Sequence, residues 1–226
     1  MTQHWLVSGA NRGIGLALAR RLAARGDRVT ASVRNETTRA AFPALGANVS
    51  TLVFDTRIEA EIRAAAANVG APIDVLVANA GAYGPKRQSA LDMDFSGALD
   101  LYSVNALGPL RTAQAFLPCL RRAANPRIVL VSSVLGSMAC EGSFNVAYRA
   151  AKAALNKIAQ CLAADLEHEG ITVIALHPGW VRTDMGGPDA PLSVEESAAG
   201  IIETIDALTI ERTGRFLDYR GEEITW

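Results

Sequence analysis

Tyr148 and Lys152 are the residues whose types and spacing best fit a chemical role in this 226-residue chain. They stand four positions apart, so on a helix their side chains project from one face, one turn from each other. A free phenol keeps its proton until about pH 10. A fixed ammonium beside it favours the phenolate, which makes the phenol an acid or base near neutral pH. The pair therefore predicts proton transfer, and the alternative is a chance tyrosine with a surface lysine.

The segment 143–166 must position this pair, and it predicts one long helix because alanine and leucine dominate it without Pro or Gly. Short apolar runs alternate with helical patterns along the rest of the chain. We expect strands at 5–8, 28–33, 50–54, 73–78, 127–132, 172–176 and 214–219, and further helices at 13–25, 57–69, 96–123 (bent near Gly108-Pro109) and 193–208. Such alternation predicts a single α/β domain over residues 1–226, a Rossmann-type doubly wound parallel sheet of about seven strands. Ligands of these sheets bind at the carboxyl ends of the strands.

A glycine-rich turn, SGANRGIG, follows the first predicted strand and opens a helix. Glycine lets the backbone approach a pyrophosphate, and the helix start offers free N–H groups and a positive dipole end. The turn therefore predicts a dinucleotide site, although a tight turn without a ligand has the same local pattern. The residues expected at the cofactor are Gly9, Asn11, Arg12, Gly13, Ile14 and Gly15.

The end of the second predicted strand indicates which dinucleotide binds. NAD sites usually place a carboxylate there for the ribose hydroxyls. This strand ends in Arg34, and Asp27 lies at its opposite end. Guanidinium groups of Arg34 and Arg12 suit a 2′-phosphate. We therefore expect a preference for NADP(H), with NAD(H) possible, unless both arginines are merely exposed.

Three further positions after strands or within helices have two interpretations each. Asp55 follows the third strand and suits either an adenine contact or a helix N-cap. The turn Asn79-Ala80-Gly81 ends the fourth strand, where small residues let a cofactor cross the sheet, or simply make a turn. Asn105 lies in a helical pattern that disfavours Asn. It fits either a local irregularity that holds a water near Lys152 or an ordinary surface position.

Two serines, Ser132 and Ser133, end the fifth predicted strand. Side chains alternate along a strand, so only one hydroxyl can hold a substrate oxygen beside Tyr148, and local pattern leaves the choice open. After the sixth strand, the rigid segment 177–184 has backbone groups that suit a nicotinamide amide. A simple loop fixed by Pro and Gly is the alternative.

Composition excludes several other classes of protein. The net charge is −1 and the 22 basic residues are scattered, which does not fit nucleic-acid binding. The start lacks a signal-peptide profile, and no run approaches the roughly 18 apolar residues of a membrane span. The three cysteines have no CxxC or histidine partner at ligand spacing, so we expect reduced thiols, a cytoplasmic protein and no metal site.

The motifs occur in an order that resembles the short-chain dehydrogenase/reductase family across nearly the whole chain. They are SGANRGIG, Asp55, ANAG, Asn105, the serine pair 132–133, YRAAK and PGWVRTD. The segment HPGWVRTDMGGPDAPLSVEES is most similar to the carbonyl-reductase and C-factor-like branch of this family. The resemblance implies a catalytic set of Asn105, Ser133, Tyr148 and Lys152. It also implies further cofactor contacts at Asp55, Thr56, Asn79, Ala80, Gly81, Tyr148, Lys152, Pro178, Gly179, Val181 and Thr183.

The reaction implied by this resemblance is reduction of a ketone, aldehyde or quinone by NADPH, with Tyr148 as the acid. The alternatives are an alcohol dehydrogenase working in the oxidative direction, or a nucleotide-binding signalling protein of the C-factor kind. Expected substrate contacts are Ser133, Tyr148, Tyr83, Trp180 and Met185, with Ala82, Leu135 and Phe144 as further candidates, the last two competing with a core role. The short segment 185–192 predicts an open site, and relatives suggest a homodimer formed through the two long helices.

Overall fold

The computed structural model describes residues 2–226, which form one seven-stranded parallel sheet in the order β3-β2-β1-β4-β5-β6-β7. The strands are β1 (His4–Val7), β2 (Arg28–Val33), β3 (Val49–Val53), β4 (Val75–Ala78), β5 (Arg127–Val131), β6 (Thr172–His177) and β7 (Phe216–Asp218). The helices are α1 (Gly13–Arg25), α2 (Glu36–Ala40), α3 (Glu59–Ala67), α4 (Phe95–Tyr102), α5 (Gly108–Leu120), α6 (Val146–Leu166) and α7 (Val194–Asp206). Short turns of 3-10 helix are η2 (Val134–Gly136), η3 (Glu167–Glu169) and η4 (Ile210–Arg212), and η1 (Ser103–Leu107) is a π-helix.

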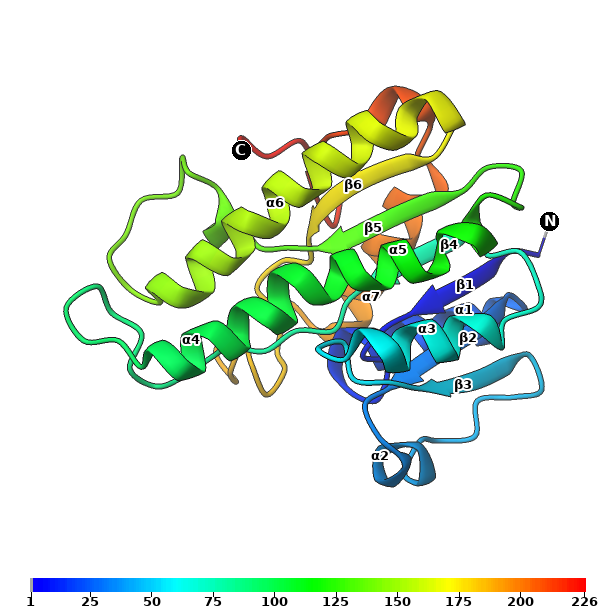
Figure 1. The fold of residues 1–226 in the computed structure, drawn as a ribbon, viewed down its shortest axis with the longest axis horizontal. Helices are drawn as coiled ribbons and strands as arrows, with labels where there is room; N and C mark the ends of the chain where they lie inside the picture. Colours follow the sequence, from blue (N-terminus) through cyan, green and yellow to red (C-terminus); the bar gives the residue numbers. More distant parts are fainter. Residues whose placement is uncertain (1) are drawn as a thin grey trace.

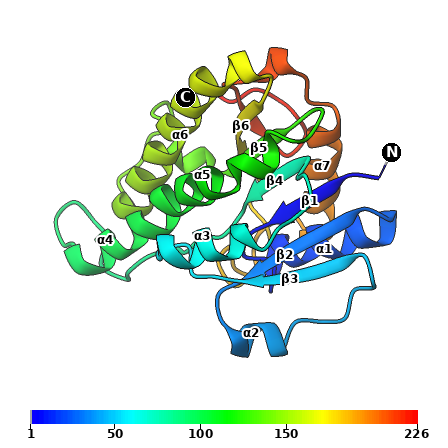
Figure 2. The ribbon, with the colours of Figure 1, turned by 45° about the vertical axis from the view of Figure 1, so that its right-hand side comes forward.

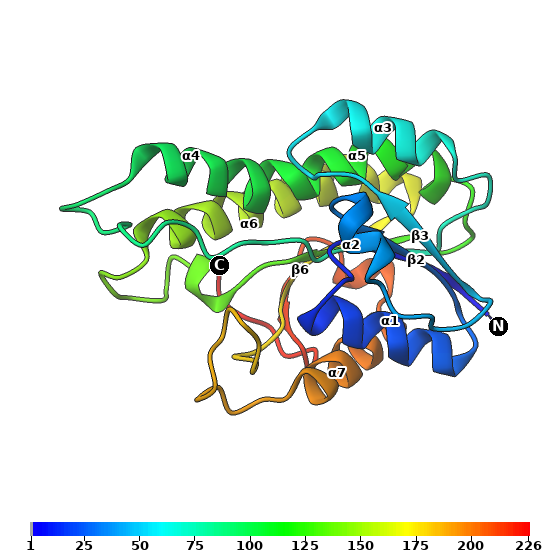
Figure 3. The same ribbon diagram turned by 90° about the horizontal axis from the view of Figure 1, so that it is seen from below.

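Helices cover both faces of the sheet, as the alternating pattern predicted. Helices α3, α5 and α6 lie on one face, with α4 continuing the line of α5, while α1 and α7 lie on the other (Figures 1 and 3). Figure 2 shows the sheet between these two layers. The core is accordingly divided in two: Leu76 packs under α3, α5 and α6, whereas its neighbour Val77 packs against α1 and α7. The prediction of a doubly wound parallel sheet is confirmed.

The sheet reverses its direction of growth between β1 and β4, which lie side by side. In such folds the crevice beyond the carboxyl ends of the strands at this switch point holds the ligand. The SGANRGIG turn after β1, the ANAG turn after β4 and the serines after β5 all lie on this edge. The fold therefore gathers the predicted site residues on one side of the molecule.

The structure corrects several predicted boundaries. The helix expected over 96–123 is three pieces, α4, the π-helix η1 and α5, because the turn around Asn105 is widened. The helix expected from Ser143 begins at Val146, because Asn145 adopts left-handed backbone angles (φ 54°, ψ 44°) that no helix can include. Helix α2 was missed; its signal is Asn35, whose side chain accepts a hydrogen bond from Thr38 N.

Two expectations about other kinds of site can be compared with residues 2–226. Within this range, no helix has both the length and the apolar character needed to cross a bilayer. The same residues contain no group of three or more His, Cys, Asp or Glu side chains placed to hold a metal ion. Cys119, Cys140 and Cys161 are all free thiols, and Cys119 is buried.

Candidate active site

Helix α6 carries Tyr148 and Lys152 on its buried face. Both side chains are largely enclosed, with exposed fractions of 8% and 5%. Apolar and small residues repeat at spacings of three and four along this face, which anchors the helix against η1, η2 and β6. The Lys152 Nζ lies 5.9 Å from the centre of the Tyr148 ring. The predicted pair therefore shares one buried face, and the surface-lysine alternative is wrong.

The structure separates the two serines at the end of β5. Ser132 donates a hydrogen bond to Asn156 Oδ1 at 2.6 Å, so its hydroxyl joins the end of β5 to the buried face of α6. Ser133 faces the opposite side, toward Tyr148, and its hydroxyl acts to lower the pKa of that phenol. Its Oγ also accepts from Leu135 N at 3.2 Å, which fixes the side chain. Ser133 is therefore the serine that faces Tyr148.

The ionisation of Tyr148 differs from the expectation. Burial raises the pKa of the Tyr148 phenol above its ordinary value of 10.0, and the nearby Ser133 hydroxyl offsets this rise only in part. We expected the Lys152 ammonium to lower this pKa. Instead, Lys152 donates to Val131 O at 2.7 Å, so its charge is held by a strand carbonyl. Burial lowers the pKa of Lys152 from 10.5 to about 8.

Asn105 is fully buried in the π-helix η1, so the surface-residue alternative is wrong. Its side-chain amide forms two hydrogen bonds with Ala82, accepting from Ala82 N and donating to Ala82 O, each at 2.8 Å. These bonds fix the backbone of the loop segment that follows the ANAG turn. The predicted local irregularity is present, and both polar atoms of the Asn105 side chain are paired with the Ala82 backbone.

The two turns expected at the cofactor, after β1 and after β4, pack directly on each other. Asn79 Nδ2 donates to Ser8 O and Gly9 O, and the Ser8 hydroxyl accepts from Asn79 N at 3.0 Å. A Cβ on Gly9 would lie 2.8 Å from Ala80 Cα, and one on Gly15 would lie 2.4 Å from Gly9 O. Glycine is therefore required at both positions for the turns to approach this closely.

The start of α1 has neither a capping side chain nor a negative charge. No side chain caps this helix, and its first turn holds no acidic residue. Arg34, at the end of β2, is exposed, and its charge lowers the pKa of Asp55 after the larger effect of Arg57. Arg12 instead forms an exposed ion pair with Asp184 at 2.6 Å.

Asp55 does not cap α3, whose N-cap is Ile58. The Asp55 carboxylate accepts from the backbone N of Arg57 at 2.9 Å and pairs with the Arg57 guanidinium. The helix-capping interpretation is therefore wrong. The neighbouring Thr56 is buried beside it, and a Cβ on Gly108 would lie 3.0 Å from Thr56 Cβ.

The segment that follows β6 also lies at the carboxyl edge of the sheet, and contacts within the protein fix its backbone. Gly179 has a positive φ of 88°, and Val181 is buried and bridges to Leu192. Thr183 Oγ1 accepts from Gly186 N at 3.0 Å, and its methyl lies where a Cβ on Gly13 would reach it at 3.4 Å. The residues after β6 therefore touch the glycine-rich turn.

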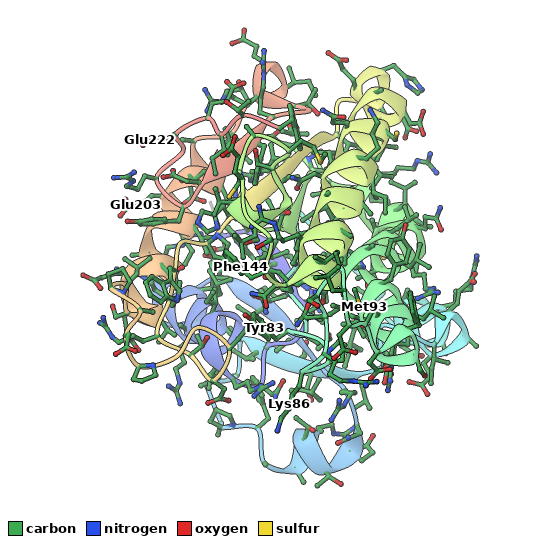
Figure 4. The ribbon with its side chains drawn as sticks, turned by 90° about the vertical axis from the view of Figure 1, so that its left-hand side faces the viewer. Tyr83, Lys86, Met93, Phe144, Glu203 and Glu222 are labelled. Carbon is green, nitrogen blue, oxygen red and sulfur yellow. The ribbon has the colours of Figure 1, made fainter. Side chains whose placement is uncertain are left out.

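Aromatic and apolar side chains surround the entrance to this edge. Figure 4 looks onto the carboxyl ends of the strands, with Tyr83 and Phe144 near its centre. Trp180 and Met185 are 58% and 42% exposed, and Phe144 is 55% exposed over Arg149, so the core role considered for Phe144 is wrong. Leu135 is partly buried against Tyr148 and Ala151. Its position is therefore compatible with both core packing and substrate contact.

Sequence reasoning missed two residues that contact this site. Gln88 and Asn145 hold the segment after β4 against the start of α6. Gln88 carries no local signal, because it lies in an irregular loop far from any motif. The signal for Asn145 was available, since Asn tolerates left-handed backbone angles better than most residues.

Comparisons with known proteins agree with this geometry. The family model described as short chain dehydrogenase matches residues 3–191. The chain is 46% identical over 170 residues to C-signal from Myxococcus xanthus, covering 73% of this chain and 100% of that protein. It is 34% identical to 1-hydroxy-2-glutathionyl-2-methyl-3-butene dehydrogenase from Rhodococcus sp., covering 98% of each chain.

Solved structures superpose over the full chain. The NADPH-bound carbonyl reductase from chicken fatty liver has a TM-score of 0.90 and 31% identity, covering 100% of this chain and 99% of that one. Carbonyl reductase Sniffer of D. melanogaster has a TM-score of 0.91 and 31% identity over 100% of both chains. The family model, these relatives and the parallel sheet with its glycine-rich turn together show that this chain belongs to the short-chain dehydrogenase family of oxidoreductases, in the branch of the carbonyl reductases and C-signal.

Proposed function

We propose that this protein reduces a ketone, aldehyde or quinone to the alcohol with NADPH, and that Tyr148 supplies the proton. The observation that carries the proposal is the buried Ser133–Tyr148 hydroxyl pair beside Lys152 at the carboxyl edge of the sheet. Two donors that face one point can hold and protonate a single oxygen. Residues 1–226 are proposed to form one dinucleotide-binding domain, since a single sheet carries every element of the site.

The residues at the switch point fit a dinucleotide. The open start of α1, with no acid in its first turn, favours a pyrophosphate, and the close-packed glycines keep side chains out of that space. Arg34 replaces the acid that a ribose 2′-hydroxyl would require. The bound NADP in a Burkholderia multivorans short-chain dehydrogenase/reductase, at 33% identity and a TM-score of 0.90, supports the same cofactor here.

The chain's own groups divide the chemistry between them. When bound, NADPH supplies the hydride that the carbonyl carbon accepts. Ser133 donates a hydrogen bond to the substrate oxygen, and Tyr148 gives that oxygen its proton as negative charge develops on it. Lys152, held by Val131 O one helical turn from Tyr148, would donate hydrogen bonds to the nicotinamide ribose hydroxyls. Asn105 holds the backbone at Ala82 that borders this space.

A regulatory role is the second candidate, because the 46% identity to C-signal is the highest among the relatives named above. Pure nucleotide binding needs no buried acid, however, and the Ser133, Tyr148 and Lys152 arrangement is complete in this chain. The loss of NADPH absorbance with a panel of ketones, aldehydes and quinones tests the choice. Turnover with at least one class supports the reductase. Binding of NADPH without turnover of any of them, or of the corresponding alcohols with NADP⁺, supports a regulator, and turnover of alcohols alone supports the oxidative direction.

Replacing Arg34 tests the cofactor preference. We expect Arg34→Asp to raise the KM for NADPH by about tenfold or more, because it exchanges a charge-assisted hydrogen bond to phosphate for repulsion. The KM for NADH should change by less than about threefold. Arg28→Asp, at the opposite end of β2, is the matched control and should leave both values near the parent's. Unchanged NADPH affinity in Arg34→Asp would show that Arg34 does not contact the cofactor.

We also propose a homodimer formed through α4. Four side chains near this helix, Leu91, Phe95, Leu99 and Tyr102, are exposed, and Phe95 and Leu99 by 76% and 73%. Isolated exposed apolar residues are common, but a stripe along one helix marks an interaction surface.

Replacing Leu99 tests the proposed dimer interface. Leu99→Glu is expected to shift the sedimentation coefficient from that of a dimer to that of a monomer, because it places a charge in the centre of the stripe. Ile210→Glu, at an exposed apolar position on another element, should remain dimeric. A parent protein that sediments as a monomer at every concentration would refute the proposal.

A further inference from the structure

The first turn of α6 has no cap of its own. Asn145, the residue at the N-cap, makes no side-chain hydrogen bond to the turn, and its left-handed angles take the chain abruptly away from the helix. The turn also lacks an acidic residue. A helix start normally leaves its first N–H groups without partners inside the helix. In α6 these groups include the backbone N–H of Tyr148, the proposed acid.

The missing cap is supplied by Gln88, which lies 60 residues away in the loop between β4 and α4. The carbonyl oxygen of Gln88 accepts from Val146 N at 2.8 Å, and its side-chain Oε1 accepts from Tyr148 N at 3.1 Å. Gln88 is only 5% exposed. One residue thus satisfies two donors of the turn that carries Tyr148, as a capping side chain usually does from within the helix.

The other end of the Gln88 side chain holds the loop from which it comes. Its Nε2 donates to Tyr83 O at 3.1 Å and to Pro85 O at 3.0 Å, so all of its polar atoms are paired. Tyr83 in turn lies with its ring 5.5 Å from that of Tyr148, and its hydroxyl accepts from Asn145 Nδ2. Figure 4 shows Tyr83 and Met93 on the same face as Phe144. The loop and the helix start are therefore joined by three hydrogen bonds and one contact between aromatic rings.

We propose that Gln88 is a positioning residue, which caps the helix of Tyr148 from another segment and fixes the phenol and the Tyr83 ring as one unit. This inference rests on the proposed function, because it gives Gln88 a part in placing the proposed acid. A buried amide with every donor and acceptor paired can take only one orientation. The hydroxyl of Tyr148 must lie within hydrogen-bond reach of the substrate oxygen, so a loosened first turn lowers the fraction of productive complexes.

Gln88→Met tests the proposal, because methionine keeps the length of the side chain while removing its three hydrogen bonds. With whichever carbonyl substrate the parent turns over, we expect kcat to fall by about tenfold and the KM for NADPH to change by less than twofold. The matched control is Asp94→Ala. It removes the N-cap of α4, the Asp94 bond to Gly97 N at 3.0 Å, in the same loop, while the hydrogen bonds of Gln88 to α6 stay in place.

The control separates positioning from general loosening. Both variants should lower the melting temperature, whereas only Gln88→Met should lower kcat. An equal fall in kcat for Asp94→Ala, or an unchanged kcat for Gln88→Met, would overturn the assignment.

Amide hydrogen exchange in the parent protein tests the cap without an activity assay and without a variant. The amide of Tyr148 is expected to exchange at least tenfold more slowly than the amide of Ala147, which lies between the two capped positions. Equal exchange at the two amides would show that Gln88 does not cap the helix. Slow exchange in a protein that reduces no carbonyl would leave the cap standing and reject the function.

Discussion

Tyr148→Phe is expected to lower kcat for carbonyl reduction by about a thousandfold while leaving the dissociation constant of NADPH within about threefold of the parent's. General acid catalysis contributes roughly 10²–10⁴ in rate, and phenylalanine removes the only atom that Tyr148 contributes to it. The ring itself is buried and packs with Leu101 and Ala151, contacts that phenylalanine keeps. The variant should therefore fold normally and bind cofactor.

Steady-state loss of NADPH absorbance measures the effect, and fluorescence titration of NADPH measures the binding. Tyr219→Phe is the matched control, since Tyr219 follows β7, two strands from β5, and packs with the core cluster of α1 and α7 rather than with Tyr148. Turnover within tenfold of the parent in a Tyr148→Phe protein that binds NADPH would mean that another group supplies the proton.

Lys152→Met is expected to abolish measurable turnover and yet to make the protein more stable. Burial lowers the pKa of Lys152 from 10.5 to about 8, so the folded state disfavours the ammonium by about 3 kcal/mol. Methionine fills similar space without charge, although the bond to Val131 O, worth about 1–2 kcal/mol, is lost. A net gain of about 1–2 kcal/mol should raise the melting temperature near pH 7 by several degrees.

The sign of the pH dependence follows from the same pKa. Below about pH 8 the lysine is charged in both states, and the full cost falls on the folded protein. As pH rises from about 8 to 10.5, the folded state releases its proton first, and the parent gains stability relative to Lys152→Met. Lys152→Met should therefore melt several degrees above the parent at pH 7 but not above it at pH 10, while Lys157→Met, on the exposed face of α6, should follow the parent at both pH values. A Lys152→Met protein less stable than the parent at pH 7 would contradict this account.

The pattern of apolar strands and amphipathic helices was sufficient to predict the sheet and all of the long helices except the break within 96–123. That break depends on tertiary contacts, because the π-turn at Asn105 is held by two hydrogen bonds to Ala82, 23 residues earlier. The start of α6 was placed three residues early, because the left-handed preference of Asn145 was overlooked and a tertiary contact is again involved. Its first turn is defined by Gln88 in another loop, and no property of 143–146 records that partner.

The site residues were predictable to the extent that motif order defines them. The chain alone left Ser132 and Ser133 open, and only the bond from Ser132 to Asn156, four residues after Lys152, separates them. The direction of the Tyr148 pKa was mispredicted, because spacing shows that Lys152 is near but not that its ammonium is directed at Val131 O. Long-range polar partners are thus the part of this site that sequence pattern does not contain.

The central claim is that the Tyr148 phenol protonates an oxygen whose carbon lies against the reduced nicotinamide. A crystal structure of the protein with NADP⁺ and an unreactive carbonyl analogue tests it most directly. The account predicts the analogue's oxygen within about 3 Å of both Tyr148 Oη and Ser133 Oγ, and its carbon about 3–3.5 Å from the nicotinamide C4. A nicotinamide ring bound away from Tyr148 in every copy, or an analogue oxygen held by other groups, would contradict it.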